Sequence, residues 1–104
     1  MEIKMVKHII IWSFKAELSA DERKAAAAKI KQGLEGLIDK ISGLTEIKVQ
    51  TNPLPSSNGD LMLYSCFENE AALDAYQTNP NHLEVAQYVR SVVSERKCFD
   101  FSIG

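Results

Sequence analysis

Three side chains that can hold or move a proton stand out in the sequence: His8, Tyr76 and His82. A neutral imidazole is a competent general base near pH 7, and a tyrosine hydroxyl can polarise a carbonyl while an enolate develops. His8 alternates with Ile10 and Trp12, which gives an apolar wall carrying one polar group, as ligand pockets usually have. These residues indicate acid/base chemistry on a small carbonyl compound, although a lone strand histidine is more often structural.

Pro80 determines how the six-residue spacing between Tyr76 and His82 is interpreted. Six positions would place the two rings on different faces of a continuous helix, but Pro80 interrupts that helix and allows both rings to turn toward one cavity. The structural alternative is that His82, in the first turn of a helix, hydrogen-bonds to loop backbone. The side chains that we predict to line a substrate site around these groups are Ile10, Trp12, Ile30 and Tyr64.

No motif indicates a metal or a cofactor. The run His82-Leu83-Glu84 and the two dispersed histidines do not form a set such as H-E-x-x-H. Gly33 and Gly36 fall inside a predicted helix, so they cannot form a phosphate-binding loop. We attribute these two glycines to close approach of the helix backbone to a neighbouring element. We therefore predict chemistry without a metal or a cofactor.

The first half of the chain predicts a strand, a helix and a second strand. MVKHIIIWSF, rich in β-branched and aromatic residues, predicts a strand over residues 5–14. Ser19 and Glu22 form the S-x-x-E capping box of a long helix, whose left-handed stop is predicted at Gly43. The helix's apolar stripe comprises Ala26, Ile30, Leu34, Leu37, Ile38 and Ile41. Residues 44–51 then alternate as in a half-buried strand near a sheet edge.

The second half predicts a strand, a helix in two pieces and a closing strand. Residues 52–60 hold two prolines and an Asn-Gly pair, which predict a connector leading into a strand over 61–67. Asn69 can cap a short helix, and Asn79-Pro80 then restarts it with Asn as cap and Pro at the first helical position. The alternation over 96–102 predicts the last strand.

The element order β-α-β-β-α-β predicts an α+β fold, the ferredoxin-like split βαβ with an antiparallel four-stranded sheet and both helices on one face. All of residues 1–104 fit one domain. Two helices cover only one face, yet the first and third predicted strands carry large apolar groups on both. A second copy of the chain, packed sheet against sheet, is the simplest cover, so we predict a homodimer.

The composition excludes several classes of partner. The 104 residues include 12 basic and 14 acidic side chains, for a net charge of −2, and no stretch concentrates Lys and Arg into a stripe. We therefore expect no nucleic-acid partner. The first apolar run, residues 6–14, is interrupted by Lys7 and His8 and is shorter than the ~20 residues that span a bilayer. We expect no membrane segment and no signal peptide.

The two cysteines indicate in which cellular compartment the protein is expected. Cys66 and Cys98 have neither C-x-x-C spacing nor the histidine neighbours of a zinc site. We expect both to be buried, reduced thiols, on strands too far apart for a disulfide. This usage predicts a cytoplasmic location.

Four segments carry a resemblance to a known family. They are Val6-Lys7-His8-Ile9-Ile10-Ile11 ending in Phe14-Lys15, Asn52-Pro53 to Tyr64, Ala72-Leu73-Asp74-Ala75-Tyr76-Gln77 with Pro80 and His82, and Phe99-Asp100-Phe101. Together they resemble the stress-responsive α/β-barrel (Dabb) family over nearly the whole chain. The resemblance implies a ferredoxin-like subunit and a dimer whose two sheets form a barrel.

The same resemblance implies a range of activities. A plant branch of the family includes polyketide cyclases that close aromatic rings without a cofactor, using a tyrosine and a histidine that match Tyr76 and His82; a strand histidine matches His8. The chain departs from that branch at residues 25–28, four alanines in place of bulkier side chains. Two hypotheses stay open: a homodimer that binds a small apolar carbonyl or phenolic ligand, with cyclase- or lyase-like acid/base chemistry, and a non-catalytic, stress-related scaffold with a filled dimer core.

Overall fold

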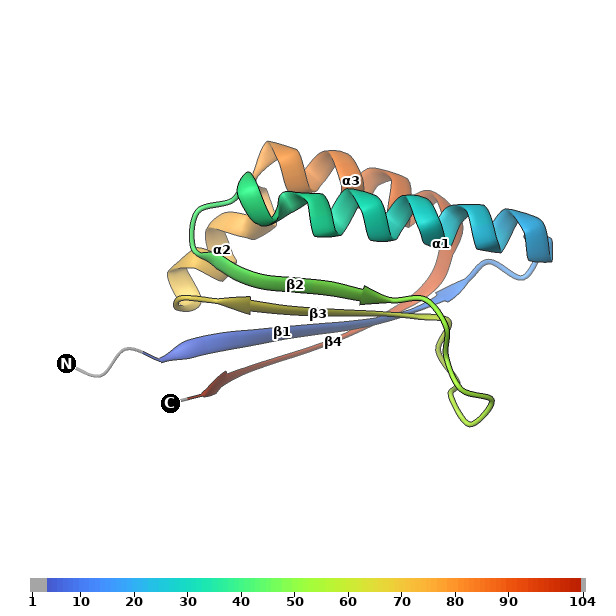
Figure 1. Ribbon diagram of the computed structural model, residues 1–104, viewed down its shortest axis with the longest axis horizontal. Helices are drawn as coiled ribbons and strands as arrows, with labels where there is room; N and C mark the ends of the chain where they lie inside the picture. The colour runs from blue at the N-terminus through green and yellow to red at the C-terminus, as the bar shows by residue number, and fades with distance from the viewer. Residues whose placement is uncertain (1–3, 104) are drawn as a thin grey trace.

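A computed structural model describes residues 4–103 and confirms the ferredoxin-like order. Its strands are β1 (Met5–Phe14), β2 (Leu44–Gln50), β3 (Leu61–Phe67) and β4 (Val93–Ile103). Its helices are α1 (Ala20–Glu35), the short 3-10 helix η1 (Gly36–Asp39), α2 (Glu70–Thr78) and α3 (Pro80–Val92). The sheet order is β2-β3-β1-β4, with every neighbouring pair antiparallel. All helices lie on one face of the sheet (Figure 1).

Helix α1 begins where the sequence predicts and ends earlier. The Ser19 side chain accepts from the Glu22 backbone N–H at 3.1 Å, and the Glu22 carboxylate accepts from the Ser19 N–H at 2.8 Å, which completes the capping box. The α-helix stops at Glu35 and continues as η1, so Ile38 is exposed rather than part of the buried stripe. Gly43 does take the predicted positive φ, at 85°.

The core lies between the helices and the inner face of the sheet. Strand β1 buries alternate side chains, as its sequence predicts; they are Val6, His8, Ile10, Trp12 and Phe14. Ile30 and Leu34 of α1 pack onto this layer and are almost fully buried. The histidine is therefore held inside the apolar core of the subunit.

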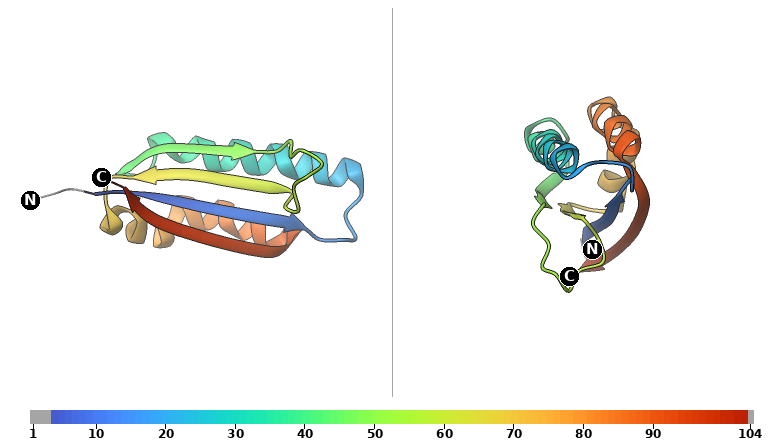
Figure 2. Two further views of the ribbon diagram at one scale, coloured as in Figure 1. Left: turned by 90° about the horizontal axis from the view of Figure 1, so that it is seen from below. Right: turned by 90° about the vertical axis from the view of Figure 1, so that its right-hand side faces the viewer.

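No described helix covers the other face of the sheet, and below the strands Figure 1 and the end-on view of Figure 2 show only the connector between β2 and β3, at one end. This open face carries large apolar side chains with substantial exposure: Ile11, Phe99, Phe101 and Ile103. As predicted, the sheet has two apolar faces, and the helices cover only one of them. Within residues 4–103 no helix is long and apolar enough to cross a membrane.

The two cysteines lie on the strands that flank β1, as predicted. Cys66 pairs with Lys7 and is buried, whereas Cys98 pairs with Ile10 and is exposed, because β4 is an edge strand. The prediction that both thiols are buried is therefore wrong for Cys98. Both are free thiols.

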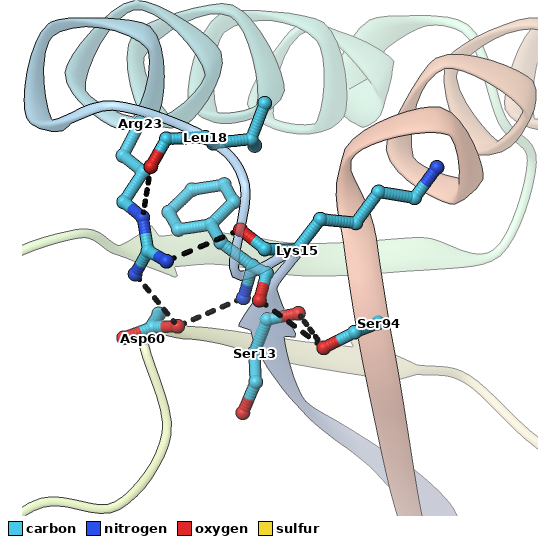
Figure 3. A network of polar contacts seen from close by, with 7 residues as sticks. Ser13, Lys15, Leu18, Arg23, Asp60 and Ser94 are labelled. Carbon is cyan, nitrogen blue, oxygen red and sulfur yellow. Dashed lines mark hydrogen bonds and ion pairs between the residues drawn. The ribbon is translucent and has the colours of Figure 1, made fainter.

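A polar network ties the end of β1 to α1, to the 52–60 connector and to β4 (Figure 3). The Asp60 carboxylate accepts from the Phe14 N–H at 2.8 Å and lies 3.9 Å from the Arg23 guanidinium. Arg23 also donates to the backbone oxygens of Leu18 and Lys15, each at 3.1 Å. These contacts fix the end of the strand that carries His8 and Trp12.

Candidate functional site

A cavity of about 430 Å³ lies between the sheet and the last two helices. His8, Ile10 and Trp12 of β1 line it from the sheet, and Tyr76 of α2 and His82 of α3 line it from the helices. The structure thus brings the three candidate acid/base residues to one cavity. Its volume is within the range of small-molecule sites.

The break between α2 and α3 aligns Tyr76 with His82. Asn79 ends α2 and caps α3 with an extended backbone (φ −65°, ψ 129°), and its side chain accepts from the Asn81 N–H at 2.9 Å. Pro80 follows as the first residue of α3, where its missing N–H costs no hydrogen bond. The Tyr76 and His82 rings end with centroids 4.0 Å apart and planes inclined by 31°.

Two polar atoms at the cavity have no hydrogen-bond partner within residues 4–103: the hydroxyl of Tyr76 and Nδ1 of His82. Burial raises the pKa of the Tyr76 hydroxyl, so the group stays protonated and available as a donor. Burial also lowers the pKa of His82 and outweighs the backbone oxygens of Gln77 and Tyr76, which lie near the ring and raise it, so the neutral form of the ring is favoured. The pair therefore offers one donor and one acceptor side by side.

His8 completes the row and has a partner of its own. Its ring is 98% buried (2% exposed), with its centroid 6.0 Å from Tyr76 and 6.3 Å from Phe67. Nδ1 lies 2.5 Å from the Asp100 carboxylate. An ionised carboxylate only accepts, so Nδ1–H donates and Nε2 is left as the acceptor of the neutral ring.

The four predicted lining residues divide into two pairs. Ile10 and Trp12 line the cavity, because they share the inner face of β1 with His8. Ile30 and Tyr64 do not line it. Ile30 is fully enclosed in the core under α1, and Tyr64 alternates onto the open face of β3, where its hydroxyl accepts from the Lys7 ammonium.

The sequence reading missed Asp100 as the partner of His8. The alternation in Phe99-Asp100-Phe101 does put the aspartate on the face opposite the two phenylalanines. The neighbouring residues do not indicate that this face lies next to His8. The pairing of β1 with β4 decides it, since His8 and Asp100 are register partners. Arg96, which also lines the cavity, was missed for the same reason, whereas Arg90 reaches the cavity through the packing of α3 on the sheet.

Comparisons with known structures show the fold in other proteins. A dimeric protein of unknown function with a ferredoxin-like fold from Bacteroides fragilis is 28% identical, with 95% of this chain and 96% of that chain covered and a TM-score of 0.90. A dimeric ferredoxin-like protein of unknown function from Thermobifida fusca is 17% identical (99% and 94% covered, TM-score 0.82). Hydroxynitrile lyase from Passiflora edulis is 18% identical (99% and 96% covered, TM-score 0.75).

Sequence comparison assigns the family. A search against curated protein sequences finds no significant match. A family model for the stress-responsive A/B barrel domain, Dabb, matches residues 6–103. Since this match spans nearly the whole chain and the observed topology agrees with it, the chain belongs to the stress-responsive A/B barrel (Dabb) family.

Proposed function

We propose that this protein is a homodimer whose subunit cavity binds a small, mainly apolar molecule bearing a carbonyl or phenolic oxygen, with cofactor-free acid/base chemistry at Tyr76 and His82. The observation that carries the proposal is the pair of buried, unpartnered polar atoms at the cavity, Tyr76 Oη and His82 Nδ1. A buried polar group left unsatisfied costs about 1 to 3 kcal/mol, so a fold that keeps two of them side by side favours an external partner.

The chemistry follows from the protonation states of the pair. The Tyr76 hydroxyl donates to the carbonyl oxygen of the ligand and stabilises the charge that develops on it. Neutral His82 accepts a proton through Nδ1 from the carbon beside that carbonyl, so the electron pair of the broken C–H bond moves into the enolate. His8, oriented by Asp100, presents its second ring nitrogen as a further acceptor.

The environment of the cavity supports an apolar substrate body. Ile10 and Trp12 line its sheet side, and Val89 of α3 adds to the apolar lining. The fold is shared with hydroxynitrile lyase from Passiflora edulis, so the architecture hosts an enzyme elsewhere. That likeness supports the architecture alone, and the choice of substrate class rests on the side chains of this chain.

The homodimer is supported by the open sheet face and by the assembly of similar structures. Phe99 is 68% exposed and Ile11 is 45% exposed, on a sheet face that the helices do not cover and that the 52–60 connector reaches at Ile11. Similar structures from Bacteroides fragilis and Thermobifida fusca are described as dimeric. Two such faces packed together would enclose these side chains in the interior of a barrel.

Ligand titration tests the binding site. The ring protons of His8 and His82 are followed by NMR while keto and phenolic compounds are added to the wild-type protein, His82→Ala and the neighbouring control Asn81→Ala. We expect at least one compound to shift both rings in the wild type, to bind Asn81→Ala equally, and to lose affinity for His82→Ala.

Chemical denaturation of the same variants separates this proposal from the scaffold alternative. Because Nδ1 of His82 has no partner, we expect His82→Ala to lower the free energy of unfolding by about 1 kcal/mol or less. A loss of about 1 to 3 kcal/mol, with no compound shifting either ring, would favour a histidine that only holds a filled core together.

A further inference from the structure

A second cluster of reactive groups lies where β1 meets the edge strand β4. Nδ1 of His8, Sγ of Cys98 and a carboxylate oxygen of Asp100 all lie within 4.8 Å of one another. Sγ is 3.8 Å from Nδ1 and 3.3 Å from Oδ1 of Asp100. These atoms are an imidazole nitrogen, a thiol sulfur and a carboxylate oxygen, the three donor types that zinc binds in proteins.

The pairing of β1 with β4 brings His8, Cys98 and Asp100 together, so no sequence motif predicts this cluster. His8 is the register partner of Asp100, and the adjacent inner-face position of β1, Ile10, is the partner of Cys98. Cys98 and Asp100 are two residues apart and therefore point to the same face of β4. Both are exposed, because β4 is the sheet edge, so a cation from solvent can reach them.

We propose that His8, Cys98 and Asp100 form a three-ligand site for Zn²⁺ or a divalent cation of similar preference, with its remaining position open to water. Tetrahedral zinc, with bonds of about 2.0 to 2.3 Å, separates its ligand atoms by roughly 3.3 to 3.6 Å. The two distances to sulfur already approach these values, and only the Nδ1–Oδ1 pair, at 2.5 Å, must widen. On binding, the Nδ1 proton relocates to Nε2 and the thiol proton leaves to solvent.

The surrounding charge also favours a cation. A groove of about 490 Å³ beside the cluster is lined by three carboxylates, those of Glu70, Asp74 and Asp100, and its lining includes no Lys, Arg or His. Arg96, two residues before Cys98 on the same face of β4, is the one cationic side chain on that face of the strand. Arg96 lies beside the Cys98 thiol, so a cation would approach the cluster from its carboxylate side, through the groove.

The chain contains its own control for thiol binding. Cys66 is also a free thiol, but it is buried, and its partner Lys7 places it on the open face of the sheet, away from His8's side chain. A cation that binds to thiols by chance would reach exposed Cys98 more readily than buried Cys66, so the dependence on Asp100 is the stricter test. A cation bound by the cluster requires Cys98 and Asp100 together.

Co²⁺ binding to the untagged, full-length protein tests the site, because a cobalt–thiolate bond gives a charge-transfer band in the near ultraviolet. We expect one Co²⁺ per chain, displaced by Zn²⁺, and the thiolate band. Cys98→Ala should abolish the band, and Asp100→Asn should lower the affinity by at least about tenfold. Cys66→Ala should change neither, and circular dichroism confirms that each variant is folded.

The metal site shares His8 with the proposed cavity, but Cys98 and Asp100 lie outside the cavity lining and Tyr76 and His82 lie outside the cluster, so the two proposals can fail separately. His82→Ala should keep the cobalt band while losing binding of the carbonyl or phenolic ligand. Absence of the band in the wild type, or its persistence in Cys98→Ala, would overturn the metal site without touching the cavity proposal. Equal loss in Cys66→Ala and Cys98→Ala would also overturn it, since adventitious thiol binding would then account for the signal.

Discussion

A tyrosine hydroxyl enclosed without a hydrogen-bond partner is costly to a folded chain, and Tyr76 carries one. The residue is fully buried, yet its ring is well packed, with centroids 5.0 Å from Phe67 and 4.0 Å from His82. The ring therefore contributes to the core while the hydroxyl opposes folding. This division separates what Tyr76 does for stability from what it does for binding.

Tyr76→Phe keeps the ring and removes the unpartnered hydroxyl. We expect the free energy of unfolding to stay equal or to rise by about 1 kcal/mol, because no intramolecular hydrogen bond is lost. Binding of a carbonyl ligand should weaken, since its donor is gone. Urea denaturation and ligand titration on the same variant measure the two effects.

Tyr88→Phe is the matched control for this substitution. Tyr88 is half-buried on α3, outside the cavity lining, with the Lys29 ammonium 4.0 Å from its ring centroid. We expect loss of the Tyr88 hydroxyl to change the free energy of unfolding by less than about 0.5 kcal/mol. A drop of 1 kcal/mol or more in Tyr76→Phe alone would contradict an unpartnered hydroxyl.

At the scale of elements, the approach of α1 to α3 sets where the cavity-lining helix sits. A Cβ built on Gly33 would lie 3.1 Å from Cγ1 of Val85, so the glycine lets the two helices pack closely. A Cβ on Gly36 would meet nothing within 4 Å. The close-approach explanation of the two glycines is therefore right for Gly33 and wrong for Gly36.

Alanine at each glycine tests this contact. Gly36→Ala should raise the free energy of unfolding by about 0.4 to 1 kcal/mol, because it restricts the unfolded chain and its backbone (φ −66°, ψ −12°) suits alanine. Gly33→Ala should gain less or lose stability, since Val85 must shift. Thermal denaturation of both variants measures the two changes in stability. An equal gain in stability in Gly33→Ala would mean that α3 tolerates displacement.

The whole molecule presents an apolar sheet face that a single subunit does not cover. Ile10 packs under the helices, so a charge placed there would disrupt the subunit core and would not probe the open face. Phe99 is the sensitive position, because it is 68% exposed on the open face. Association of two such faces would remove these exposed apolar side chains from water, which favours a dimer.

Light scattering should report about twice the 11.6 kDa of one chain for the wild type. Phe99→Asp should give a folded monomer, because pairing would bury an unpaired charge. Ile38→Asp, an exposed apolar position on the helical side, should remain dimeric. A wild-type protein that is monomeric at micromolar concentration would contradict the sheet-to-sheet dimer.

Local patterns in the sequence determined the elements of this protein. The alternation in β1, the capping box at Ser19 and the Asn79-Pro80 break each specify backbone geometry through neighbouring residues, and each was predicted with its consequence. The same patterns predicted the ferredoxin-like order and allowed the convergence of Tyr76 and His82, because that convergence depends on the break at Asn79-Pro80, which lies between the two residues. The exposure of Cys98 was predicted incorrectly, since alternation gives a face but not a position within the sheet.

Tertiary structure alone decided which side chains meet across the sheet. Ile30 and Tyr64 satisfy the same apolar and aromatic patterns as Ile10 and Trp12, yet they lie outside the cavity, because the faces that α1 and β3 present depend on their packing partners. The contact of His8 with Asp100 joins residues 92 positions apart through strand register. Periodicity determines the face on which Asp100 lies, but not which residue of β1 lies opposite it, since that pairing depends on how the whole sheet packs.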